Sequence, residues 1–207
     1  MNAVGNDLVY LDDPEIAEHH LRPRFVARVC APGERRRLAG SGEPKALLWS
    51  LWAAKEAAYK AAGKMRPGLV FAPRLYEVDG AMSRVRYRDV VMAVRLAMDP
   101  LWVHAVAVCG GGDPGRAVTG VQAIPGGRHQ SQAVRDLARR GVAAHFGLQE
   151  PRLAIERPRD PGARDGLAPP RLLLDGRPSG IDISLSHDGP FAAFAALPQE
   201  AFPAASR

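Results

Sequence analysis

The chain has 207 residues, of which 46% are hydrophobic, and carries a formal net charge of +6. This size and apolar content predict a soluble globular protein with a packed core, and no run of 18 or more apolar residues is present to suggest a membrane span. The positive charge favours an anionic partner, but the sequence lacks zinc-finger spacing, an RNP-like aromatic motif and a long basic run, which argues against nucleic acid.

The first half of the chain predicts a strand, three helices and an antiparallel sheet, in that order. The strand covers residues 5–11 and ends at an Asp-Asp-Pro turn. The helices are expected at residues 15–20, 32–38 and 41–63. Ser41 is the expected N-cap of the third helix, and Gly63 suits the C′ position that ends it. Three β-rich runs follow, GLVFAPRLYEV, VVMAVRLAM and WVHAVAVC, before a glycine-rich linker at residues 109–115.

The second half predicts one long helix, a strand and a closing hairpin. SQAVRDLARRGVAAHFGL has apolar residues at helical spacing, with Gly147 as a stop signal. EPRLAIERP is strand-like, and RDPGARDGLAPP is a loop. The last run, IDISLSHDGPFAAFAAL, predicts a turn between two short strands.

The two halves have a similar order of elements, which indicates a duplicated helix-plus-sheet unit. Pro73 and Pro151, each after a long helix, lie 78 residues apart, and His104 and His187 lie 83 apart. The same offset of 78 places Val134 opposite Glu56, so the second unit lacks that acid. We therefore expect one asymmetric site, and we divide the chain at the linker into residues 1–112 and 113–207.

The helical run LWAAKEAAYKAAGK carries the first candidate functional residues. At about 100° per residue, Glu56 and Lys60 share one stripe beneath Trp49 and Trp52, whereas Lys55 points about 100° away and is expected to be structural or a secondary contact. A surface i,i+4 ion pair would explain the stripe equally well. The flanking alanines favour a site, because small side chains let another backbone or a ligand come close.

Two further motifs supply polar groups from elsewhere in the chain. Asp7, in GND, offers a second carboxylate, and two carboxylates completed by a ligand's phosphates suit Mg²⁺. Ser186 and His187 open the Asp188-Gly189 turn, where a hydroxyl, an imidazole and turn amides can converge on a phosphate. Taken singly, GND also fits a plain turn and the histidine a structural role.

Together GND, LWAAKEAAYKA and ISLSHDG resemble the signatures of the 4′-phosphopantetheinyl transferases: a Gly-x-Asp near a strand, a Trp-x-x-Lys-Glu-Ala helix and a Ser-His strand end. The helix match from Trp52 to Ala57 is complete. RFVARVCAPGERRRL is similar to the family's intervening segment, and DGRP at residues 175–178 to the Gly-Lys-Pro of its two-domain members. The resemblance implies an α+β fold of two similar helix-plus-antiparallel-sheet units in a pseudo-two-fold arrangement.

The sequence departs from the two-domain pattern in two ways. Val9 stands where those members carry a further acid in Gly-x-Asp-x-Glu, so the metal motif resembles that of the single-domain holo-acyl-carrier-protein synthases. The chain is longer than those synthases, and its Ser-His half comes last instead of first. Either a single-domain member carries a long insertion, or a two-unit member has its halves in swapped order. The duplicated order and the GRP motif favour the swap.

The resemblance implies Mg²⁺-dependent transfer of the phosphopantetheine arm of coenzyme A to a serine of an apo acyl or peptidyl carrier protein, which releases adenosine 3′,5′-bisphosphate. Asp7 and Glu56 would hold the metal, with Glu56 as base and Lys60 on the α-phosphate region. The nucleotide phosphates would contact Lys60, Lys64, Arg177, Ser186 and His187. A coenzyme A-binding or carrier-binding homologue without turnover stays open as an alternative, and a nucleic-acid-binding module would leave the helix motif unexplained.

Basic residues near the first helices are the expected contacts for an acidic carrier protein. They are His19, His20, Arg22, Arg24 and Arg28, although a generic solvated surface would look the same. Carriers of fatty-acid, polyketide and nonribosomal-peptide synthesis all stay open. Cys30 and Cys109 lack metal-ligand spacing and predict buried thiols in a reducing compartment. The opening MNAVGNDLVYLDD lacks the order of a signal peptide, so a cytoplasmic location is expected, with no membrane partner.

Overall fold

The computed structural model describes residues 2–66, 68–162 and 166–199, which form two five-stranded antiparallel sheets and four α-helices. The first unit (residues 2–109) contains β1 (Ala3–Tyr10), η1 (His19–Leu21), α1 (Pro23–Val29), α2 (Pro32–Ala39), α3 (Pro44–Met65), η2 (Pro73–Leu75), β2 (Tyr76–Val78), β3 (Arg84–Tyr87), β4 (Val90–Asp99) and β5 (Trp102–Cys109). The second unit (residues 114–198) contains η3 (Pro114–Arg116), β6 (Val118–Ala123), α4 (Gln130–Phe146), η4 (Glu150–Arg152), β7 (Leu153–Glu156), β8 (Arg171–Leu174), β9 (Arg177–Asp188) and β10 (Phe191–Pro198).

The two sheets have the same topology, so the predicted fold class is confirmed. Their strand orders are β1-β5-β4-β3-β2 and β6-β10-β9-β8-β7. In each unit the long helix follows the first strand, and a 3-10 turn leads into the second. The boundary that we proposed at residues 112/113 lies between β5 and β6 and stays a proposal.

The sheet register corrects one predicted correspondence between the units. The hairpins β4–β5 and β9–β10 close at Asp99↔Trp102 and Asp188↔Phe191, which gives an offset of 89 residues. His104 lies on β5 and His187 on β9, the counterpart of β4. Pairing the two histidines was therefore wrong, because at this offset His187 corresponds to Met98.

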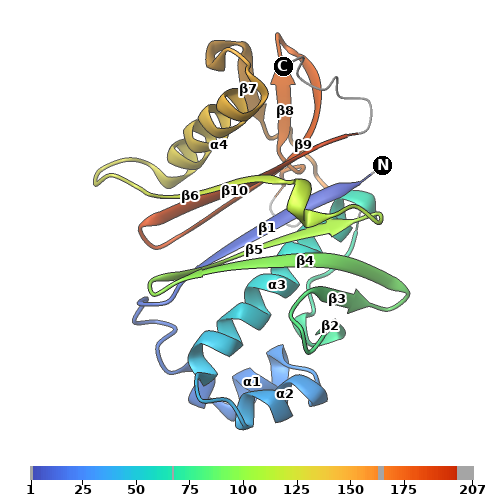
Figure 1. The fold of residues 1–207 in the computed structure, drawn as a ribbon, viewed down its shortest axis with the longest axis vertical. Coiled ribbons are helices and arrows are strands. Elements are labelled where there is room, and N and C mark those ends of the chain that lie inside the picture. The colour runs from blue at the N-terminus through green and yellow to red at the C-terminus, as the bar shows by residue number, and fades with distance from the viewer. Residues whose placement is uncertain (1, 67, 163–165, 200–207) are drawn as a thin grey trace.

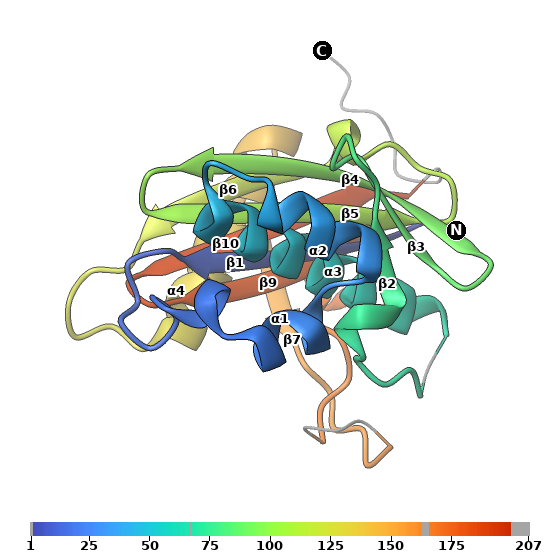
Figure 2. The same ribbon diagram turned by 90° about the horizontal axis from the view of Figure 1, so that it is seen from below.

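The elements stack in layers (Figure 1): α3 lies below the first sheet, the two sheets face each other in the middle, and α4 lies above the second sheet. Figure 2, seen from below, shows α1 and α2 over the side of α3 that faces away from its sheet. One apolar core lies under each long helix, and a third, which includes Val4, Val106 and Leu197, draws on both sheets. Among the described residues, no helix is long and apolar enough to cross a membrane.

Several predicted boundaries were wrong for local reasons. Residues 15–18 form turns instead of a helix, because the Asp13 carboxylate accepts the Glu15 amide in a tight turn. The Ser41 hydroxyl accepts the Glu43 amide in a similar turn, so α3 begins later, at Pro44. Gly63 lies inside α3, whereas Gly147 ends α4 in the left-handed conformation (φ 65°), as predicted.

Several strands differ from the prediction in extent, or were not predicted. Only residues 76–78 of the first β-rich run are a strand, because Pro73 starts a 3-10 turn. The short strands β3, β6 and β8 were not predicted at all. Part of the loop predicted at residues 159–170 lies outside the described residues.

Candidate active site

Three predicted residues meet between β1 and α3. The Lys60 Nζ lies 2.8 Å from Asp7 Oδ1 and 3.5 Å from Glu56 Oε1, and it donates to the Asn6 carbonyl at 3.1 Å. Asp7 is buried, whereas the Glu56 and Lys60 side chains each keep 28% of their area exposed. The helix stripe is thus more than a surface ion pair, because a strand carboxylate joins it.

Small residues make this approach of strand and helix possible. A Cβ atom added to Gly5 would lie 2.0 Å from the Ala57 carbonyl oxygen, so only glycine fits there. The alanines that flank the stripe are buried and pack α3 against the sheet, for example Ala57, Ala58 and Ala61. What comes close to them is the backbone of β1, which brings Asp7 to the level of Lys60.

The buried position of Asp7 changes how the group ionises. Burial raises the pKa of the Asp7 carboxyl to about 7; Lys60 opposes this rise and Glu56 adds to it. Burial acts to lower the pKa of the Lys60 ammonium, but Asp7 and Glu56 outweigh it and raise that pKa. The lysine therefore stays protonated at neutral pH and neutralises part of the carboxylate charge.

The second unit brings Ser186 and His187 to the same place. The Ser186 hydroxyl lies 3.3 Å from Asp7 Oδ1 and accepts the Leu8 amide at 3.1 Å. His187 lies near the end of β9 with part of its ring exposed; the burial of the rest of the ring and the charge of Lys60 lower the pKa of the imidazole. Groups that lie about 130 residues apart in the sequence thus share one site.

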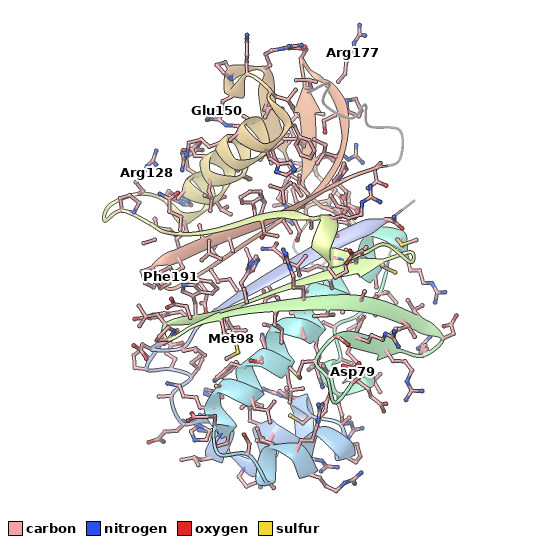
Figure 3. All side chains as sticks on the ribbon, in the orientation of Figure 1. Asp79, Met98, Arg128, Glu150, Arg177 and Phe191 are labelled. Atoms are coloured by element: carbon pink, nitrogen blue, oxygen red, sulfur yellow. The ribbon has the colours of Figure 1, made fainter. Side chains whose placement is uncertain are left out.

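Two predicted nucleotide contacts lie elsewhere. Lys64 is enclosed: its Nζ donates to the Val4 and Ile183 carbonyls at 2.8 and 2.6 Å and binds the Asp182 carboxylate at 2.9 Å. Arg177 is ten residues before His187, at the other end of β9. Figure 3 shows Arg177 and Phe191 at opposite ends of the second unit. The structure brings neither residue to the group around Asp7.

The predicted partner-binding arginines lie on and beside α1. Arg22, Arg24 and Arg28 are exposed, and the Arg28 guanidinium lies 5.4 Å from the centre of the Phe25 ring. Phe25 in turn stacks on Trp52, one helical turn before Glu56. This basic surface is therefore linked through Phe25 to the helix stripe that carries Glu56.

The donor set near Asp7 suits a hard divalent cation. Asp7 and Glu56 both contact the Lys60 ammonium, so their oxygens converge on a region within reach of one ion. Carboxylate oxygens with substrate phosphates are the ligands that Mg²⁺ prefers. Among the described residues there is no cluster of three or more acidic, histidine or cysteine side chains suited to a metal. Any metal here would rely on substrate oxygens to complete its shell.

Buried polar residues support the site, and of these only Lys55 was predicted to be structural. Lys55 is fully buried and pairs with buried Glu34 at 2.5 Å, which makes it structural. The side-chain amide nitrogen of Asn6 lies 3.1 Å from the buried His104 imidazole. Asp182, Ser184 and Asp188 accept backbone amides of β1. Their alternation in DISLSHD was a visible signal, but the strand that they face was not.

Comparison with protein families matches part of this chain. A family model described as the 4′-phosphopantetheinyl transferase superfamily matches residues 3–84, which include Asp7, Glu56 and Lys60. No curated protein matches the chain.

Solved structures of acyl-carrier-protein synthases are similar to about half of the chain. The Mycobacterium tuberculosis acyl carrier protein synthase is 30% identical over 52% of this chain and 96% of its own, with a TM-score of 0.39. The Chronobacterium ammoniagenes complex with coenzyme A is 26% identical over 53% and 96%, with a TM-score of 0.43. The Neisseria meningitidis holo-[acyl-carrier-protein] synthase is 21% identical over 52% and 97%, with a TM-score of 0.44.

Proposed function

Since this chain belongs to the 4′-phosphopantetheinyl transferase superfamily, we propose that it transfers the 4′-phosphopantetheine arm of coenzyme A to a serine of an apo acyl or peptidyl carrier protein. The observation that carries the proposal is the meeting of Asp7, Glu56 and Lys60 with Ser186 where the two units join. A carboxylate pair, an ammonium and a hydroxyl in one place suit the transfer of a phosphate group.

The internal repeat supports a single site. The sheet register places Gly120 where the first unit has Asp7, and the offset between the hairpins places Ala97 and Met98 at the positions of Ser186 and His187. Val134, the residue 78 positions after Glu56 in the sequence, is buried in α4. The second junction therefore lacks counterparts of the Asp7 carboxylate and of the serine-histidine pair.

In the proposed reaction the carrier serine attacks the phosphorus that bears the pantetheine arm. Its oxygen forms the new P–O bond, the bond to the nucleotide's 5′-phosphate breaks, and adenosine 3′,5′-bisphosphate leaves. Glu56, partly exposed, takes the serine proton, and Lys60 neutralises charge on the phosphates. Mg²⁺, held by Asp7 and Glu56, would supply further charge neutralisation. Ser186 and His187 hold the nucleotide phosphates from the second unit.

The exposed arginines of α1 are the proposed contact for the carrier, whose surface must then be acidic. Two buried free thiols, Cys30 and Cys109, fit a reducing cytoplasm as the proposed location. Since the reaction needs only coenzyme A and a carrier, we propose neither a nucleic-acid nor a membrane partner.

The test is intact-mass analysis of a panel of apo carrier proteins incubated with coenzyme A, Mg²⁺ and this protein. We expect one carrier class to gain the mass of one phosphopantetheine arm. Glu56→Gln should abolish the gain while the variant stays folded by circular dichroism, because the amide cannot take the proton. Full transfer by this variant would refute the proposed role of Glu56.

The small number of carboxylates available as metal ligands supports a second candidate function, that of a homologue that binds coenzyme A without transferring its arm. Only two acidic ligands serve the site among the described residues. Calorimetric binding of coenzyme A, with no mass gain on any carrier in the panel, would establish this alternative.

A further inference from the structure

The outer edge of β1 is bound by a row of side chains from β9. The amides of alternate β1 residues donate to alternate β9 side chains, always 178 residues further on. These contacts, which we call the seam ladder, are Val4 to Asp182 (2.7 Å), Asn6 to Ser184 (2.9 Å), Leu8 to Ser186 (3.1 Å) and Tyr10 to Asp188 (2.7 Å). The ladder joins strands of different sheets without any backbone pairing between them.

The ladder and two lysines together provide hydrogen-bond partners for the outward-facing backbone groups of β1. β1 is the outermost strand of its sheet, and alternate amides and carbonyls of such a strand point away from its neighbour and need partners. Lys64 binds the Val4 carbonyl and Lys60 the Asn6 carbonyl. The short serines lie in the middle of the row and the longer aspartates at its ends. Two twisted strands that cross are closest at the crossing and diverge on either side, so the outer contacts need longer side chains.

The corresponding junction between β4 and β6 has no such ladder. At the offset of 89 residues, the β4 positions that match the four ladder residues are Ala93, Arg95, Ala97 and Asp99. Within the described residues, one side-chain hydrogen bond joins β4 to β6, from Arg95 to the Thr119 hydroxyl at 3.2 Å. The ladder is therefore confined to the junction that carries the catalytic groups, so a general need of the fold does not explain it.

We infer that the seam ladder positions the two halves of the active site, and that Asp182 and Ser184 are positioning residues for the reaction although they do not touch the reacting groups. The inference rests on the proposed function. Asp182 lies four residues before Ser186, and its carboxylate also binds Lys64 of α3, whose side chain keeps 11% of its area exposed. The ladder repeats every two residues, so the next matching register would move Ser186 about 7 Å along β1, away from Asp7.

Two substitutions test the ladder away from the chemistry. Asp182→Ala removes the Val4 acceptor and the partner of Lys64, and Ser184→Ala removes one hydroxyl and leaves that ion pair intact. For both we expect kcat for arm transfer to fall by about 10- to 100-fold, because small displacements of catalytic groups are costly. The KM for the carrier should stay within about twofold, since α1 is not disturbed. Asp182→Asn keeps an acceptor and should recover most of the loss.

A second measurement needs no catalysis. Hydrogen exchange of the peptide 2–10, followed by mass spectrometry, should show the Asn6 amide exchanging about 10-fold faster in Ser184→Ala, the factor expected for one lost buried hydrogen bond. Absence of transfer by the wild-type protein would overturn the proposed function, and the exchange measurement would still test the ladder.

Val142→Ala is the matched control for stability, because Val142 is fully buried in the core of the second unit and takes no part in the ladder. It should lower the melting temperature without lowering kcat where it is folded. Three results would overturn the inference: a kcat in the ladder variants no lower than in this control, a carrier KM that rises as kcat falls, or unchanged exchange of the Asn6 amide.

Discussion

Lys55, inside the Trp-x-x-Lys-Glu-Ala motif, is predicted to stabilise the fold and to take no part in transfer. Its Nζ lies 2.5 Å from Glu34 and donates to the Val29 carbonyl at 2.7 Å, with no exposed area. Burial lowers the pKa of the Lys55 ammonium, and the charge of Glu34 opposes this. Glu34 in turn accepts the amides of Ala31 and Val78, so one ion pair links α2, α3 and β2.

Lys55→Met would leave the Glu34 carboxylate buried without its counter-ion. Removing one partner of a buried pair costs about 3–5 kcal/mol, which for a chain of this size corresponds to a melting-temperature loss of roughly 6–20 °C. Urea unfolding gives the free energy of unfolding, and differential scanning fluorimetry gives the melting temperature. Where the variant is folded, kcat for arm transfer should match the wild type.

Two further variants make this prediction specific. Lys55→Met with Glu34→Gln removes both charges and keeps an acceptor for one amide, so most of the lost stability should return. Arg86→Met breaks the exposed pair with Glu77 and should cost less than about 1 kcal/mol. The reasoning would be refuted by a Lys55→Met variant that keeps wild-type stability and loses transfer.

Three other predictions concern Asp7, Gly5 and α1. Because burial raises the pKa of Asp7 from 3.8 to about 7, the folded state binds the proton more tightly, and stability should fall as the pH rises from about 4 to above 7; without divalent cations, the melting temperature of Asp7→Asn should exceed the wild-type value more at pH 8 than at pH 5. Gly5→Ala should destabilise the protein by about 1–3 kcal/mol in urea unfolding and reduce kcat, since its Cβ would meet the Ala57 carbonyl; wild-type behaviour would contradict the close approach of β1 and α3. Arg24→Glu with Arg28→Glu should raise the KM for an acidic carrier at least about 10-fold with little change in kcat, and an unchanged KM would place the carrier elsewhere.

Local patterns were sufficient to identify half of the site. Glu56 and Lys60 are four residues apart on one helix, and helical geometry makes them neighbours whatever the rest of the chain does. The repeated order of elements likewise predicted two helix-plus-sheet units. The short strands β3 and β8 escaped prediction because three or four alternating residues carry little signal without their neighbours.

Long-range contacts decided the rest. Lys64 and Arg177 looked like phosphate ligands because both are cationic and lie near the motifs, yet one is enclosed by Asp182 and two carbonyls and the other is at the far end of β9. Neither outcome can be derived from the spacing of residues along the chain: two of the three partners of Lys64, Asp182 and Ile183, belong to the other unit, and the position of Arg177 depends on the course of β9.

The sequence by itself determined the chemistry available to this protein: a carboxylate and an ammonium on one helix, a carboxylate on a strand, and a serine-histidine pair before a turn. Only the tertiary structure decided that these groups meet, because β1 and β9 are joined through backbone amides and side chains 178 residues apart. Every residue carries a backbone amide, so the sequence cannot mark which amides Asp182, Ser184, Ser186 and Asp188 will bind; the packing of one sheet on the other selects them.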